Sequence, residues 1–391
     1  MRAARRLRVV SGAAAFTVLL ASAPAANAAQ WAVQSNSGSG DLTGVACTSR
    51  TACTAVGNAP TAGGSSTRVV VERWNGAHWS SQSTPTPAGS RGASLLAVSC
   101  VSGTDCVAVG VSYERPGGLD SVTLAERWNG SRWSITPTPP ATHLHDGTLD
   151  AVSCSSPSAC SATAIYLTRG GNSTSVAERW NGHRWSLQAL ATPVNAQGRR
   201  GSEVLSGISC ASQAVCTAVG TAFFSGALAS ITLAERWNGH HWSVQRTANP
   251  SGSLGSALIG VDCTPPSTCY AVGNTTVPST SPSSPPTQEP VAEHWNGDRW
   301  SMPTSAWPSI QLGSELNSIS CISARACVAA GAGPSGLATV AESWSGHRWS
   351  LAHTPSLSGS SNGFFGIACP THTLCFGVGT SQAGLLIERY S

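Results

Sequence analysis

The chain has 391 residues, of which 41% are hydrophobic and only 10% are charged. Globular proteins carry roughly 25% charged residues, so Gly, Ser, Thr, Pro and Ala must form much of this surface. The net charge of +4 comes from the four arginines of the first 28 positions, because 18 basic and 18 acidic residues remain after them. A chain without a basic surplus gives no electrostatic support for nucleic-acid binding.

The first 28 residues are typical of a secretory signal peptide. Four arginines precede a mostly apolar run, Val9–Leu20, and Ala26-Asn27-Ala28 is an A-x-A cleavage site. Such a segment is removed on export. The pair Arg5-Arg6 leaves open whether export uses the general or the twin-arginine route. No later apolar stretch is long enough to span a bilayer, so we expect a secreted, extracellular protein that is either released or associated with the cell wall.

The rest of the chain repeats a short motif around two tryptophans. Six segments read Glu-x-Trp-x-Gly-x-x-Trp-Ser, and they begin at Glu72, Glu126, Glu178, Glu235, Glu293 and Glu342. The Asn-Gly pair found in five of them is typical of a β-hairpin turn. A two-residue turn would place Glu72 opposite Trp79, whereas a four-residue turn would pair Trp74 with Trp79. Either turn leaves the Glu and both indoles on one face of the hairpin, and Arg73 and His78 on the other.

A second predicted hairpin precedes each motif and carries two cysteines. Five residues separate the two cysteines in all seven copies. An even number of cysteines after a signal peptide implies disulfides, and a short hairpin loop brings the paired Cα atoms into disulfide range. The spacing does not fit a zinc knuckle and no His recurs beside it, so we expect no metal. The predicted bonds are Cys47–Cys53, Cys100–Cys106, Cys154–Cys160, Cys210–Cys216, Cys263–Cys269, Cys321–Cys327 and Cys369–Cys375.

Four strands per repeat, with a mean period of roughly 54 residues, resemble one blade of a β-propeller. The chain ends with Leu385–Ser391, where the turn should follow, and residues 30–35 match the missing strand. WD-repeat and kelch propellers close their rings in this way, and the chain also resembles uncharacterised secreted repeat proteins of high-GC Gram-positive bacteria. We expect an all-β, seven-bladed β-propeller over residues 29–391. Each four-stranded antiparallel blade should hold one disulfide, and the last blade should be split between residues 30–35 and 364–391.

The repeats differ from one another in two kinds of connection. If the strands are named A to D from the axis to the rim, the A–B loops and C–D turns have constant length, whereas the B–C loops and D–A links vary. Both variable connections reach the same face of the disc, and repeat scaffolds usually bind on their variable face. The candidate ligand-binding residues on this face are Tyr113, Arg115, His143, His145, Asp146, Tyr166 and Trp307.

The repeated residues have a structural and a functional interpretation. The tryptophans could be sugar-stacking platforms, but their equivalent positions inside strands favour packing between blades. Seven equivalent Glu favour a structural pair with an Arg or a backbone group of an adjacent blade over catalysis. His143 and His145 have no third metal ligand beside them, so we expect them to be solvated.

These observations favour a secreted, non-catalytic binding or scaffold propeller. The sequence has no sialidase-type Asp box and no Cys left over for a copper-radical site. Its carboxylates outside the repeat form no paired motif of the kind that glycosidases use. A lectin-like propeller is the alternative, and a glycan-active propeller enzyme is a second one. We expect a monomer without a cofactor that binds an unknown protein or glycan on the variable face.

Overall fold

The computed structural model describes residues 29–391 except 36–37, 115–119, 227–228, 266–267, 280–284, 303–312, 356, 358 and 360. The predicted signal peptide lies outside the described residues. None of the helices in the described part of the chain is long and apolar enough to cross a membrane.

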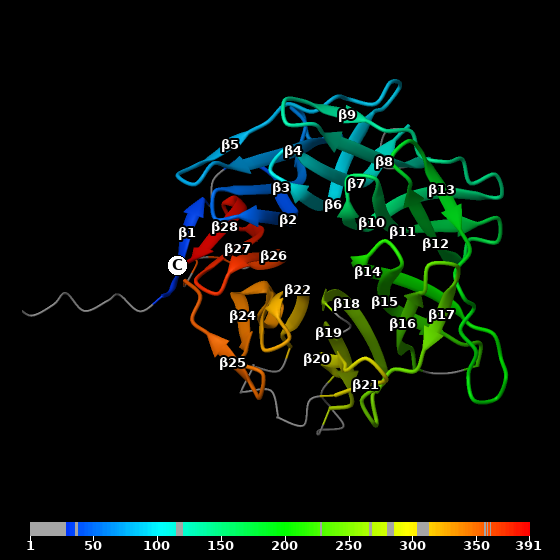
Figure 1. Ribbon diagram of the computed structural model, residues 1–391. Coiled ribbons are helices and arrows are strands. Elements are labelled where there is room, and N and C mark those ends of the chain that lie inside the picture. Colours follow the sequence, from blue (N-terminus) through cyan, green and yellow to red (C-terminus); the bar gives the residue numbers. More distant parts are fainter. Residues whose placement is uncertain are drawn as a thin grey trace, which may run out of the picture.

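Seven four-stranded antiparallel sheets are arranged as blades around one axis, which confirms the predicted propeller (Figure 1). In each blade the strands follow one another in the chain from the axis to the rim, except in the last blade. The strands are, for blade 1, β2 (Asp41–Ser49), β3 (Ala52–Pro60), β4 (Thr67–Trp74) and β5 (Trp79–Ser81); for blade 2, β6 (Gly92–Ser102), β7 (Asp105–Tyr113), β8 (Ser121–Trp128) and β9 (Trp133–Ile135); for blade 3, β10 (Leu144–Ser156), β11 (Ala159–Thr168), β12 (Ser173–Trp180) and β13 (Trp185–Gln188); for blade 4, β14 (Ser202–Ser212), β15 (Val215–Phe223), β16 (Ile231–Trp237) and β17 (Trp242–Gln245); for blade 5, β18 (Gly255–Thr264), β19 (Thr268–Val277), β20 (Thr287–Trp295) and β21 (Trp300–Ser301); for blade 6, β22 (Glu315–Ser323), β23 (Ala326–Ala332), β24 (Thr339–Trp344) and β25 (Trp349–Ala352), with the 3-10 turn η1 (Pro334–Gly336); and for blade 7, β26 (Gly363–Thr371), β27 (Leu374–Ser381), β28 (Gly384–Tyr390) and β1 (Trp31–Ser35).

The N-terminal strand closes the ring as the sequence predicts. Strand β1, drawn in blue, pairs antiparallel with β28, drawn in red (Figure 1), and Trp31 lies opposite Tyr390. Trp31 is buried and its ring lies 5.5 Å from that of Phe364. The pairing covers two strand edges that would otherwise be open to other chains.

The Trp hairpins have four-residue turns, so the two-residue alternative is wrong. Trp74 pairs directly with Trp79 across β4 and β5. The side-chain oxygen of Asn75 accepts hydrogen bonds from the backbone N–H groups of Ala77 and His78, at 2.9 and 3.0 Å. Gly76 has a φ of 101°, which favours glycine. Asn-Gly therefore suits this turn, because the Asn side chain holds the turn together and Gly allows the chain to reverse.

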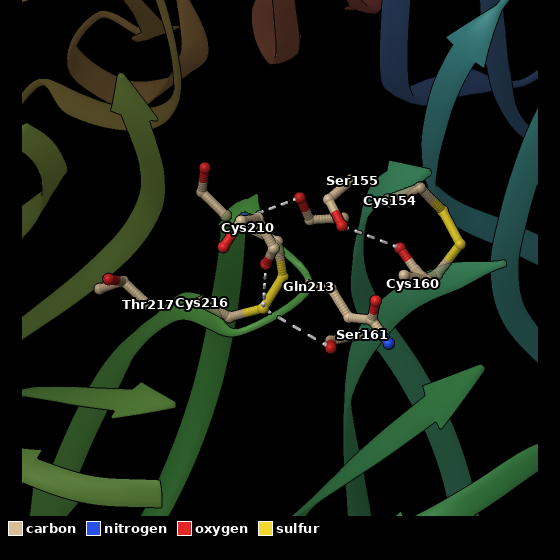
Figure 2. The surroundings of a disulfide bond; sticks show 12 residues. Cys154, Ser155, Cys160, Ser161, Cys210, Gln213, Cys216 and Thr217 are labelled. Atoms are coloured by element: carbon tan, nitrogen blue, oxygen red, sulfur yellow. Dashed lines mark hydrogen bonds between the residues drawn. A yellow bond between two sulfur atoms is a disulfide. The ribbon is translucent and has the colours of Figure 1, made fainter. Parts of the chain in front are cut away.

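All seven predicted disulfides form, each inside one blade. Their Cα atoms lie 3.9–4.0 Å apart across the A and B strands. The bonds also contact the neighbouring blade, since Cys216 Sγ of blade 4 lies 3.7 Å from Ser161 Oγ of blade 3 (Figure 2). Next to it, the hydroxyl of Ser153 accepts a hydrogen bond from the Cys210 N–H, at 2.9 Å. The N–H groups of Cys154, Cys263, Cys321 and Cys369 donate to the preceding blade in the same way, so the disulfide ends of five inner strands are fixed to a neighbour.

Arginine and tryptophan of the repeat pack the blades against each other. The guanidinium of Arg73 in blade 1 lies 4.6 Å from the ring centroid of Trp128 in blade 2. The same contact joins four further pairs of neighbouring blades, through Arg127 and Trp180, Arg179 and Trp237, Arg236 and Trp295, and Arg389 and Trp74. Where blade 5 carries His294 in place of Arg, the Tyr270 ring stacks on His294 at 4.5 Å and contacts Trp344. The repeated Trp therefore serve packing between blades, as the structural interpretation predicts.

Candidate binding site

Each hairpin places its repeated Glu in the contact with the preceding blade, which we call a seam and name by its two blades. Six copies have fully buried side chains with 0% exposure, and these are Glu126, Glu178, Glu235, Glu293, Glu342 and Glu388. The copy in seam 7/1, Glu72, is only half-buried and lines a cavity. One seam of the seven therefore differs from the others.

The link that follows an outer strand covers the next blade's Glu. Ala191, six positions after Trp185, donates its N–H to Glu235 at 2.9 Å. Ala248, six positions after Trp242, donates to Glu293 at 2.8 Å. These are the backbone partners from an adjacent blade that the sequence predicts. Of the two kinds of partner that the sequence left open, Arg or backbone, these seams use the backbone, and the repeat arginines lie on tryptophan rings instead.

Three links carry proline at the position six residues after the Trp of the outer strand, and proline has no N–H to donate. These residues are Pro85, Pro139 and Pro355. Two of the carboxylates that follow find hydroxyl donors instead: Glu178 accepts from Tyr166 at 3.1 Å and Glu388 from Thr339 at 3.2 Å. Glu126, which follows Pro85, has no partner for either oxygen within the described part of the chain. Burial raises the pKa of Glu126 to about 8.

Seam 7/1 has the shortest link of the ring. Only the five residues 36–40 lie between β1 and β2, whereas the other links have eight to thirteen residues. The position opposite the Glu on the outer strand differs too. It holds Ser81 in blade 1 and an aliphatic residue or Met in the others, namely Val33, Ile135, Leu187, Val244, Met302 and Leu351. The Ser81 hydroxyl donates a hydrogen bond to Glu72. In seam 7/1 a hydroxyl therefore stands where the other blades have an apolar side chain, and the Glu beside it is only half-buried.

The opening in seam 7/1, which we call the seam cavity, has a volume of about 520 Å³. Small-molecule sites have volumes of roughly 300–1,000 Å³. Its walls come from β1, β28, β4 and β5, with Trp79 as the largest partly exposed side chain. The outer tryptophans of the other six blades are 2–6% exposed. The polar side chains that line the cavity are Gln34, Ser35, Ser39, Arg68, Glu72, His78, Ser81 and Gln82.

A second opening, the link cavity, lies beside the start of β4 and the link 82–91. Its volume is about 450 Å³, and it shares Arg68, Val69 and Gln82 with the seam cavity. Hydroxyl groups are frequent in its lining, which includes Thr61, Thr67, Ser83, Thr84, Thr86 and Ser90. Blade 1 thus carries two adjoining cavities.

The axial channel offers less chemistry than these cavities. It has a volume of about 170 Å³ and is lined by the inner strands of all seven blades. Asp150 is the one ionisable residue of this lining, and burial raises its pKa to about 7. A single carboxylic acid at the axis cannot by itself perform the two-carboxylate chemistry of a glycosidase.

Several residues predicted from the sequence have structural roles. His145 Nδ1 lies 2.7 Å from Asp146 Oδ2, and His145 Nε2 lies 3.1 Å from the Thr168 carbonyl oxygen. Asp146 also accepts the Ser121 N–H of blade 2 at 3.1 Å. The hydrogen bond from His145 and that from Ser121 lower the pKa of Asp146. This pair therefore links blades 2 and 3.

The other candidate residues are dispersed. The expectation that Tyr166 lies in a loop is wrong, because β11 continues to Thr168 and Tyr166 is 5% exposed. Tyr113 ends β7 and His143 is exposed just before β10, so both stay predictions for the variable face. Arg115 and Trp307 lie outside the described residues. No three His, Cys, Asp or Glu in the described ranges come close enough together to hold a metal ion.

The seam cavity was not predicted, although two of its causes can be read in the sequence. The link after Trp31 is shorter than any other, and Ser81 stands where the other repeats have an apolar residue. The prediction compared the loops of one face only, and therefore missed a site between blades.

Comparison with known proteins shows the fold and no closer relationship. No protein-family model matches the chain. No curated protein matches it in sequence. Among solved structures, the BP39L lectin from Burkholderia pseudomallei is similar, with a TM-score of 0.55 and 15% identity over 91% of this chain and 96% of the lectin. YCF48 bound to D1 peptide has a TM-score of 0.51 and 14% identity over 94% and 96% of the two chains. The GH74 xyloglucanase from Xanthomonas campestris has a TM-score of 0.51 and 12% identity over 92% of this chain and 53% of the enzyme.

Proposed function

We propose that this protein is an exported, non-catalytic binding propeller whose ligand site is the seam cavity. The observation that supports this proposal is the contrast between the seams. Six repeated Glu are fully buried, whereas Glu72 lines a cavity of about 520 Å³ together with the partly exposed Trp79. A concave site with an aromatic wall and a few polar groups is typical of ligand binding.

Binding, rather than hydrolysis, is favoured by the distribution of carboxylates. Glu72 is the one carboxylate among the described residues that line the seam cavity. Most glycoside hydrolases need two carboxyl groups roughly 5–10 Å apart. The proposal does not depend on the similar lectin, peptide complex or xyloglucanase, because identities of 12–15% establish the fold alone.

Export is supported by the cysteine chemistry and by the first 28 residues. All 14 cysteines form disulfides inside blades. Such a set is stable in an oxidising compartment and is rare in the cytosol. The basic and apolar N-terminal segment with its A-x-A site supplies the expected route.

The test uses arrays of neutral glycans, acidic glycans and peptides, probed with the mature chain. Ser81→Ile gives blade 1 the residue that blade 2 has at this position and should abolish binding of any ligand found. The matched control is Ile135→Ser, which changes the sealed seam 1/2 and should leave binding intact. Equal binding by Ser81→Ile, or no ligand on any array, would contradict the proposal.

A further inference from the structure

The seam cavity and the link cavity meet over the outer edge of β4. Strand β5 ends at Ser81, and its last pair with β4 is the one with Glu72. The Gln82 N–H still donates to Val71 at 2.8 Å, and the chain then leaves the edge. The residues common to both cavities, Arg68, Val69 and Gln82, lie at this point. The two openings therefore adjoin along one uncovered stretch of strand.

Blade 1 also lacks a hydrogen bond that closes this stretch in three other blades. In those blades a Thr hydroxyl donates to a backbone carbonyl. The Thr lies five positions after the Trp of the outermost strand. The carbonyl belongs to the residue five positions before the Trp that ends the neighbouring strand. These bonds run from Thr138 to Thr123 at 3.3 Å, from Thr247 to Thr232 at 2.8 Å and from Thr354 to Thr339 at 2.8 Å. The equivalent residues of blade 1 are Thr84 and Val69. They form no such bond in the described structure, and both line the link cavity.

The unmade bond leaves a hydroxyl and a carbonyl available to a ligand. A ligand hydroxyl can donate to the Val69 carbonyl and accept from the Thr84 hydroxyl, since each hydroxyl has one donor and two acceptor sites. A ligand that covered these groups without pairing them would bind more weakly, because a buried donor or acceptor without a partner loses its hydrogen bonds to water. The link cavity thus selects for a ligand rich in hydroxyl groups.

The groove carries charges of both signs, so neither a polyanionic nor a polycationic chain matches its whole length. Glu72 in the seam cavity repels anions, and Arg68 at its rim repels cations. Arg91 in the link cavity is exposed, and its guanidinium N–H groups can donate hydrogen bonds to ligand hydroxyls. The partly exposed Trp79 offers an apolar surface that fits the C–H face of a sugar ring.

We infer that the two cavities form one groove that binds an extended, uncharged oligosaccharide across blade 1. The inference rests on the proposed function and adds the ligand class and the second half of the site. One end of the sugar chain lies in the seam cavity with its hydroxyls on Glu72 and Ser81. The other end passes over Arg68 and Gln82 to Thr84. In the other six seams the repeated Glu is fully buried, so one chain of the protein binds one oligosaccharide.

The test is calorimetric titration with neutral oligosaccharides of one to six units, in the linkage series that the glycan array identifies. Affinity for the wild-type protein should rise with chain length and then level off. Glu72→Gln should weaken binding of every length about tenfold or more, because a hydrogen bond to a charged group contributes about 1.5–3 kcal/mol. Thr84→Val should weaken only the longer chains, about two- to tenfold. Thr138→Val, the equivalent change in blade 2, should leave all affinities unchanged.

The outcomes separate the groove from the site itself. Affinity that does not depend on length, with no effect of Thr84→Val, would overturn the groove and leave the seam cavity as a binding site. Binding of acidic glycans or peptides in place of neutral sugars would overturn the ligand class. Absence of any ligand would remove the proposed function together with the inference. Melting curves of each variant show whether a loss of affinity comes from unfolding.

Discussion

Replacing Glu126 with Gln should make the protein less sensitive to rising pH. The Glu126 side chain is 0% exposed, and neither of its oxygens has a partner in the described residues. Burial raises its pKa to about 8, so the folded state keeps a proton that the unfolded state releases near its ordinary pKa of 4.5. A raised folded pKa means that stability is fully present below the unfolded value and is lost as pH rises toward 8.

The size of the effect follows from the linkage between protons and folding. Between pH 5 and pH 8 this one carboxyl lowers the free energy of unfolding by about 1.4 kcal/mol for each pH unit. Gln has the shape of the neutral acid and cannot ionise. Glu126→Gln should therefore match the wild type near pH 4.5 and exceed it by roughly 3 kcal/mol at pH 7.

Urea unfolding at several pH values, followed by tryptophan fluorescence with the disulfides intact, measures the difference. Glu293→Gln is the matched control, because Glu293 accepts hydrogen bonds from the Ala248 N–H and the Thr232 hydroxyl. The NH2 group of an amide would face one of these two donors, so this variant should not gain stability at pH 7. Equal pH slopes for Glu126→Gln and the wild type would show that Glu126 is ionised in the folded protein and would refute the reasoning.

Three further predictions concern stability and the variable face. Removing residues 30–35 should lower the melting temperature sharply, because it exposes β28 and removes the buried Trp31; an unchanged melting curve would show that the ring closes in another way. Replacing Cys100 and Cys106 together with Ser should cost about 2 kcal/mol in urea unfolding, since the bond closes a short loop, and complete unfolding would contradict that estimate. Tyr113→Ala should leave binding in the seam cavity unchanged. A loss of affinity in titration would show that the ligand binds on the variable face of blades 2 and 3 instead.

The closed ring could be predicted because the strand that closes it can be recognised in the sequence. Residues 30–35 match the outer strands of the other repeats, and the C-terminal hairpin lacks that strand. The turn length was left open, because Asn-Gly suits two hairpin geometries and only the hydrogen bonds of Asn75 distinguish them. The disulfides were predictable because each pair flanks one short loop.

The site was harder to predict because it depends on what each link covers. All seven Glu look equivalent along the chain, yet the neighbour that buries them comes from the preceding blade. Proline or alanine at one link position decides whether a buried carboxylate receives an N–H, as Glu126 and Glu235 show. Glu72 is only half-buried, and the link before its blade has five residues where the others have eight to thirteen. That difference can be recognised only once β1 is placed in blade 7.

Indole N–H resonances test the central claim most directly. Each of the 14 tryptophans gives one such signal, and a Trp79→Phe variant identifies the signal of Trp79, the partly exposed tryptophan of the seam cavity. Addition of the bound sugar should shift the Trp79 signal and leave those of the sealed seams, such as Trp133, in place. Saturable binding that leaves Trp79 unmoved, while the backbone amides of Tyr113 and His143 shift, would place the site on the variable face and contradict the account.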